Sequence, residues 1–157
     1  MSAQCRLRYV DRTDELRLFD WVNDPEIRLW SFSNALIERK EHAHWFANSI
    51  KDPKIIILIF EVNGLPAGMV RFERNNNVAV LNYLLDRGFW GHGYGSHMLE
   101  LALLEIDCVW AGVDVLAMTL PGNIASIKSL QKVGFVVKEV TATRCECQRL
   151  HQSATGR

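Results

Sequence analysis

Three glycines stand at alternate positions in one short stretch, Gly91-His92-Gly93-Tyr94-Gly95-Ser96. Glycine has no Cβ, so the backbone there can turn tightly and come close to a ligand. The preceding residues have the pattern of a strand and the following ones that of a long apolar helix, so successive N–H groups and the first helical turn would face one concavity. The positive end of the helix dipole adds to these donors. The stretch therefore predicts an anion site, and a pyrophosphate suits it best.

The glycine spacing fits two other phosphate motifs poorly. The dinucleotide motif G-x-G-x-x-G places its third glycine one position later, within a strand–helix–strand unit, although Asp114 stands near the distance expected for its acidic residue. The P-loop requires Gly-Lys-Ser/Thr, which does not follow here. A tight turn without a ligand remains the alternative to pyrophosphate binding.

The hydrophobic pattern predicts the elements that hold this loop in place. Strands are expected at 5–10, 55–62, 67–74, 78–85, 113–120 and 135–147, and helices at 13–22, 38–50, 96–107 and 125–133. A meander of three strands is thus followed by helix, strand, helix and strand. This order predicts an α/β (mixed α+β) domain in which helices cover a mixed sheet.

Length and composition are those of one ordinary globular domain, residues 1–157. Lys plus Arg and Asp plus Glu both number 18, so no global charge favours nucleic acid or an anionic membrane. The longest apolar run, 55–60, is far shorter than the ~20 residues that span a bilayer. The four cysteines lack the spacing of a metal site. We expect a cytoplasmic protein with reduced thiols and no metal.

Two motifs together resemble the GNAT family of N-acetyltransferases. The glycine stretch is similar to the family's pyrophosphate loop, R/Q-x-x-G-x-G/A, with Gly93 and Gly95 as its two fixed glycines. Asn123-Ile124-Ala125-Ser126, continuing to Leu130-Gln131-Lys132-Val133-Gly134-Phe135, resembles the family's helix N-x-x-A/S…Y-E-K-x-G-F. The likeness covers roughly residues 55–140. It implies the GNAT fold, with a mixed sheet of about six to seven strands, and acetyl-CoA as co-substrate.

The resemblance also implies which residues form the donor site. Leu85 falls where the family's central strand splays, so its backbone N–H is the candidate oxyanion donor. The residues expected to contact acetyl-CoA are Leu84, Leu85, Trp90, Gly91, His92, Gly93, Tyr94, Gly95, Ser96, Asn123 and Ser126. Of these, we expect Tyr94 to pack behind the loop rather than to react.

The sequence departs from the family pattern in several places. Trp90 replaces the usual Arg or Gln, and Leu130 replaces a tyrosine that protonates the leaving thiolate in many members. Ala79 occupies a position that sometimes carries a glutamate base. These departures leave the catalytic acid and base open, with His42, Asn82 and Tyr83 as weak candidates. No clear seventh strand follows Cys147, which leaves open completion of the sheet by a partner, as in a homodimer.

The N-terminal part resembles N-acetyltransferases of nucleotide-linked amino sugars, which act on a UDP-4-amino-4,6-dideoxy sugar. The likeness lies in 20–30 and 40–46 and is shared more weakly by ribosomal-protein N-terminal acetyltransferases. Aromatic rings suit a base or sugar, and Arg suits a phosphate. The expected acceptor residues are Arg28, Trp30, His42 and Trp45. Core packing for the tryptophans, a solvated helix face for His42 and His44, and a plain surface charge for Arg28 are the alternatives.

The acceptor predicted from this likeness is the 4-amino group of a nucleotide-linked deoxy amino sugar. Alternatives are a protein N-terminus, a small amine such as a polyamine, and a non-catalytic domain that only binds acetyl-CoA.

Overall fold

The computed structural model describes residues 2–151. Its elements in chain order are β1 (Cys5–Tyr9), η1 (Arg12–Asp14), α1 (Glu15–Val22), α2 (Pro25–Arg28), α3 (Arg39–Ser49), β2 (Ile55–Val62), β3 (Leu65–Asn75), β4 (Val78–Leu85), η2 (Arg87–Phe89), α4 (Tyr94–Val109), β5 (Asp114–Thr119), α5 (Ile124–Lys132), β6 (Val136–Val140) and β7 (Cys145–Arg149). None of the helices among these residues is long and apolar enough to cross a membrane.

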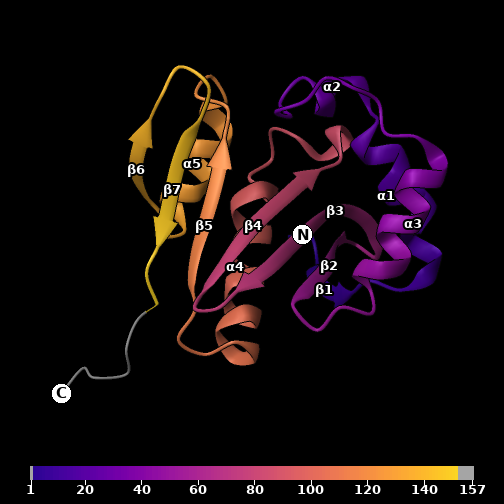
Figure 1. The fold of residues 1–157 in the computed structure, drawn as a ribbon, viewed down its shortest axis with the longest axis horizontal. Coiled ribbons are helices and arrows are strands. Elements are labelled where there is room, and N and C mark those ends of the chain that lie inside the picture. The colour runs from indigo at the N-terminus through magenta and orange to yellow at the C-terminus, as the bar shows by residue number, and fades with distance from the viewer. Residues whose placement is uncertain (1, 152–157) are drawn as a thin grey trace.

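The strands form one seven-stranded sheet in the order β1-β2-β3-β4-β5-β7-β6 (Figure 1). The β4–β5 pair is parallel, and every other neighbouring pair is antiparallel. The predicted mixed sheet covered by helices is therefore confirmed.

The C-terminal part corrects one prediction. Residues 135–147 were expected to form a single final strand, but β6 and β7 form a hairpin, and β7 lies between β5 and β6. The turn contains neither glycine nor proline. Instead, the Thr141 hydroxyl accepts hydrogen bonds from the N–H groups of Thr143 and Arg144, a turn that threonine can close. The seventh strand therefore comes from the chain itself.

Helices cover both faces of the sheet. Along β2, Leu58 and Phe60 pack on the side of α4 and α5, whereas Ile57 and Ile59 pack on the side of α1 and α3. This burial on both faces explains the continuous apolar run of β2. Trp21 of α1 is buried on the α1–α3 side, with Ile57 and Ile59. The two faces thus separate an α4–α5 layer from an α1–α3 layer.

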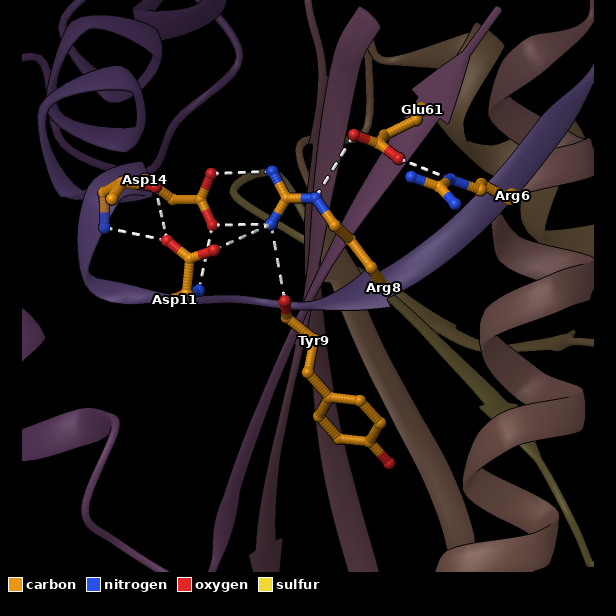
Figure 2. A network of polar contacts seen from close by, with 7 residues as sticks. Arg6, Arg8, Tyr9, Asp11, Asp14 and Glu61 are labelled. Atoms are coloured by element: carbon orange, nitrogen blue, oxygen red, sulfur yellow. Dashed lines mark hydrogen bonds and ion pairs between the residues drawn. The ribbon is translucent and has the colours of Figure 1, made fainter. Parts of the chain in front are cut away.

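A polar network ties the start of α1 to the edge of the sheet (Figure 2). The Arg8 guanidinium donates to both carboxylate oxygens of Asp14 at 2.8 Å and to Glu61 at 3.2 Å, and Arg6 donates to the other Glu61 oxygen at 2.6 Å. Both carboxylates are buried. Burial alone would raise their pKa values, but the hydrogen bonds and charges of the arginines leave the pKa of each lowered. The network therefore stabilises the fold only while both groups are ionised.

We expect Arg8→Met to lower the free energy of unfolding by about 3 kcal/mol at pH 7, because it leaves Asp14 buried and unpaired. In the native protein the lowered pKa values mean that this contribution is complete above the ordinary carboxyl pKa values of about 4. It is lost as the pH falls through the lower folded-state values. The difference between variant and native protein should therefore shrink on acidification. Urea unfolding at pH 7 and at lower pH measures both effects.

Arg6→Met is the matched control. The Arg6 side chain is 64% exposed, and its loss leaves Glu61 paired with Arg8. We expect a loss below about 1 kcal/mol. Equal losses for the two variants, at every pH, would contradict the role assigned to Arg8.

Candidate active site

Strands β4 and β5 separate at the carboxyl end of β4 (Figure 1). β4 pairs with β3 up to Leu85, opposite Gly68, but it pairs with β5 only up to Leu81, opposite Ala117. The Asp86 N–H donates to Ala67 of β3, so the alternation of backbone groups points the Leu85 N–H the other way, toward the opening. The splayed strand predicted at Leu85 therefore exists in the structure.

Gly68 makes this arrangement possible, and sequence reasoning missed it. A Cβ at Gly68 would lie 2.7 Å from the Leu84 carbonyl oxygen and 2.8 Å from the Met98 sulfur. Glycine is therefore needed for β3 to lie against both the end of β4 and helix α4. Its place inside an apolar strand was the available signal.

The glycine loop leads directly into α4. Gly91 and Gly93 have φ values of +79° and +78°, which favour glycine, and Gly93 is the N-cap of α4. Glycine at the N-cap has no side chain to accept from the first N–H groups of this helix, which leaves them available to a ligand. The helix begins at Tyr94, two residues earlier than predicted, and Gly95 and Ser96 thus belong to its first turn.

A groove of about 600 Å³ adjoins the start of α4. Its walls include Gly93 and Ser96 on one side and Lys132 and Gly134, at the end of α5, on the other. Lys132 contributes a positive charge to this groove and Glu100 a negative one, while Arg149 in its lining is paired with Asp107. The loop, the helix start and the groove together suit a ligand that carries phosphates and a nucleoside.

The remaining loop residues have different surroundings. The exposed Trp90 indole donates a hydrogen bond of 2.8 Å to the Leu85 carbonyl, so it lies over the end of β4. His92 is exposed. Tyr94 is half-buried beside Phe60 and Phe89, which places it behind the loop.

Tyr83 and the start of α5 form the other wall of the opening. Asn123 caps α5 by accepting a hydrogen bond from the Ser126 N–H at 3.2 Å. The Ser126 hydroxyl is hydrogen-bonded to the Tyr83 hydroxyl. Burial raises the pKa of Tyr83 to about 12, so this phenol stays protonated at neutral pH and can act as a hydrogen-bond donor. Leu130 and Ala79 are fully buried.

A loop between α2 and α3 presents aromatic side chains. Two hydrogen bonds between Asn23 and Ile37 close the loop, and the Arg28 guanidinium donates to the carbonyls of Ser33 and Ala35 inside it. Trp30 is exposed, so the core-packing alternative is wrong for this residue. Arg28 orders the loop backbone.

Two polar contacts hold α1 and α2, next to this aromatic loop, against the end of β4. The Asp86 carboxylate, just after β4, accepts a hydrogen bond from the Trp21 indole of α1 at 2.8 Å. Arg87 forms an ion pair with Asp24, the N-cap of α2, at 3.2 Å. Figure 1 shows α2 beside the segment that follows β4. The aromatic loop and the opening between β4 and β5 therefore belong to one end of the sheet.

His42 and Trp45 lie on α3, the helix that follows the aromatic loop. His42 is only 3% exposed, and its Nδ1 lies 3.0 Å from a Glu15 carboxylate oxygen. The solvated-face alternative is therefore wrong for His42, whereas His44 is exposed. Trp45 is half-buried, with its ring 5.3 Å from that of His42. Asn82 of β4 is exposed opposite Arg71 of β3.

The structure thus gathers the predicted donor-side residues around the end of β4, the glycine loop and the start of α5. The predicted acceptor residues fall into two groups, with Arg28 and Trp30 at the loop and His42 and Trp45 on α3. Sequence reasoning missed Arg71, a charged residue between the apolar residues Val70 and Phe72 of a predicted strand. A charged residue at such a position was the signal that could have revealed it.

Comparisons with known proteins bear on the family. Residues 4–136 match the family model described as an acetyltransferase (GNAT) domain. None of the curated proteins matches the sequence closely enough to count as a relative.

Three solved structures illustrate the likeness of fold. Spermidine N-acetyltransferase from Vibrio cholerae, in complex with CoA and spermine, is 15% identical, with a TM-score of 0.82 over 94% of this chain and 96% of that one. The aminoglycoside acetyltransferase AAC(6')-Ib, in complex with coenzyme A and kanamycin, is 18% identical, with a TM-score of 0.78 over 94% and 95%. RimL, a ribosomal L7/L12 α-N-protein acetyltransferase, is 15% identical, with a TM-score of 0.79 over 96% of each chain. At these identities the likeness shows the fold alone.

Proposed function

Because the chain belongs to the GNAT acetyltransferase family and is therefore an acetyl-CoA-dependent N-acetyltransferase, we propose that its acceptor is the 4-amino group of a nucleotide-linked deoxy amino sugar. The single observation that carries this proposal is the chemistry of the acceptor side. Exposed aromatic rings and arginine side chains gather there, next to the opening of β4.

The donor side fits acetyl-CoA. The uncapped start of α4 and the glycine loop provide N–H groups for the pyrophosphate, and Lys132 and the groove beside it suit the nucleoside end. The splayed edge of β4 provides backbone groups for an amide-bearing arm. The co-substrate supplies a thioester that is activated toward attack by an amine.

The residues at the opening then have three tasks. The Leu85 N–H stabilises the negative charge that develops on the thioester oxygen. The protonated Tyr83 hydroxyl, held by Ser126, donates a hydrogen bond toward the sulfur as its negative charge grows. With Ala79 at the glutamate position, loss of the ammonium proton passes through water beside Asn82. Positioning of the amine against the thioester supplies much of the remaining rate.

The acidic groups near the opening argue against a polyamine acceptor. Glu15 binds Arg39 and His42, Asp24 binds Arg87, and Asp86 accepts hydrogen bonds from the Trp21 indole and the Gly88 N–H. These carboxylates are therefore already occupied. A cationic acceptor would find few free counter-charges, whereas aromatic faces suit a nucleobase or a sugar ring.

An acceptor screen with acetyl-CoA tests the proposal. The panel should contain a UDP-linked 4-amino-4,6-dideoxy sugar, kanamycin, spermidine and a peptide with the N-terminus of a ribosomal protein, with release of the CoA thiol as readout. We expect the highest kcat/KM for the UDP-linked sugar. Preference for any other amine would contradict the proposed acceptor, and binding of CoA without turnover of any amine would contradict catalysis.

A further inference from the structure

Arg71 is a charged side chain in an unusual place. It lies in the interior of β3, between Val70 and Phe72, which are fully buried, and it is itself largely buried. Its side chain is on the α1–α3 face of the sheet, because the guanidinium carbon lies 5.3 Å from the ring centre of Trp45 on α3. The neighbouring strands present Ile57 and Asn82 at its level.

Among the residues that the structure describes, the Nε of this guanidinium lacks the partner that a buried donor normally has. Within residues 2–151, its Nε is buried without a hydrogen-bond partner, and no carboxylate lies within ion-pair distance of the group. The closest acidic influence is Glu73, two residues along the same face, and Glu73 is exposed. Glu15, across α3, is taken by Arg39 and His42. Only the Trp45 ring stabilises the cation directly.

An unpaired buried cation lowers the stability of the protein. Burial lowers the pKa of Arg71, and the charge of Glu73 offsets only part of this effect. Arginine stays protonated near neutral pH even when its pKa is lowered. A lowered pKa in the folded chain therefore means that the charge of Arg71 reduces the free energy of unfolding. A costly group of this kind is typical of a site that is completed by a ligand.

We propose that Arg71 binds a phosphate oxyanion of the acceptor, so that the substrate of this enzyme is an amine that also carries a phosphate or diphosphate. The proposal rests on the acceptor site assigned under the proposed function. A guanidinium matches a phosphate with two parallel hydrogen bonds, and Trp45 holds it in place from the other side.

The register sets the spacing between amine and anion. Gly68 lies opposite Leu85 and Arg71 opposite Asn82, so Arg71 is three steps of the ladder from the transfer point. At ~3.3 Å per residue, the backbone of Arg71 lies about 10 Å along the strand from the transfer point. The arginine side chain can shorten the distance between the guanidinium and that point. A free amino acid carries its amine and carboxylate on one carbon, which is too short a separation. In a nucleotide-linked sugar, a ring separates the amine from the diphosphate.

Kinetics of three variants test this role, with Arg71→Met, Arg71→Lys and the control Arg74→Met. Arg74 lies on the same strand, but its guanidinium lies over the ring of Trp110 at the end of α4. Its side chain is therefore on the α4–α5 face of the sheet, opposite to that of Arg71. For a UDP-linked 4-amino sugar we expect Arg71→Met to raise KM about 30-fold or more with little change in kcat. Arg71→Lys should raise KM less than Arg71→Met does, because lysine keeps the positive charge but lacks the two parallel N–H donors of the guanidinium. The KM for acetyl-CoA should stay within about 3-fold of native in all three variants.

Thermal unfolding provides a readout that does not need turnover. Without ligand, Arg71→Met should raise Tm by about 4 °C, because it removes an unpaired charge from the interior. With CoA saturating its own site, millimolar UDP should raise the Tm of the native protein and of Arg74→Met, but not that of Arg71→Met. A fall in the Tm of Arg71→Met without ligand, or equal UDP shifts in all three proteins, would overturn the proposal.

The outcomes separate this proposal from the proposed function. If the native protein acetylates the UDP-linked sugar and Arg71→Met does so with the same KM, the anion role is wrong and the function stands. The native protein could instead prefer phosphorylated amines that carry no nucleotide, with Arg71→Met losing that preference. The nucleotide-linked sugar would then be the wrong acceptor, but the role of Arg71 in binding a phosphate would stand. If it prefers spermidine, or a peptide amine without phosphate, both are wrong.

Discussion

Replacement of Gly93 by valine is expected to weaken the binding of acetyl-CoA about 100-fold, through the loss of phosphate contacts worth about 1.5–3 kcal/mol each. Gly93 has a φ of +78°, caps α4 and lines the groove beside it. A branched Cβ there faces the position where the phosphates approach the first N–H groups of the helix. Isothermal titration with CoA measures the change.

Gly112→Val separates this effect from backbone strain. Gly112 has a φ of +81°, and a Cβ there meets no atom within 4 Å, as is also true of Gly93. The two substitutions therefore carry a similar strain of about 1–3 kcal/mol, and both variants should lose similar stability. Gly112 lies in the turn before β5, away from the loop, so its variant should bind CoA as the native protein does. If Gly93→Val and Gly112→Val bind CoA with equal affinity, the assignment of the glycine loop to the acetyl-CoA site is wrong.

Leu85→Pro is expected to lower kcat by about 10²–10³-fold with a much smaller change in the KM for acetyl-CoA, because it removes the oxyanion donor. Proline lacks the backbone N–H, and within β3–β4 that N–H is not part of the ladder, since it points toward the opening. The sheet should therefore tolerate proline here better than at a ladder position. Steady-state kinetics and a thermal melt measure the two effects.

Leu85→Ala is the matched variant for this experiment. It removes the same partly buried side chain but keeps the N–H, so it should share the loss of stability while retaining kcat within about 5-fold. If alanine and proline lower kcat equally, the side chain rather than the amide matters. The Leu85 N–H would then have no part in catalysis.

Local signals explain why the donor side could be predicted. Gly91 and Gly93 adopt positive φ values, a property that the residue type itself favours. Asn123 caps a helix, and an asparagine before an apolar stripe indicates such a cap within a few residues of sequence. The strand periods around β2, β3 and β4 depend on the same short-range patterns. The hairpin of β6 and β7 was missed because a threonine turn lacks the glycine or proline that usually indicates one.

The acceptor side depended on contacts between segments distant in sequence. His42 is buried because its face of α3 packs against α1, and its partner Glu15 on α1 is 27 positions away in the sequence. The Trp90 indole could have faced a phosphate, but the chain after β4 brings it to the Leu85 carbonyl. Nothing near Arg71 in the sequence predicts that a helix would cover it or that Glu15 of α1 would be paired with Arg39.

The sequence by itself therefore determined the first five strands of the sheet, the glycine loop before α4 and the family, because backbone preferences and hydrophobic periods are properties of short stretches of chain. Only the tertiary structure decided which charges are paired and which are buried. Burial and pairing are properties of the packed chain, since each depends on what the layers of helix and sheet bring within a few ångströms of a side chain.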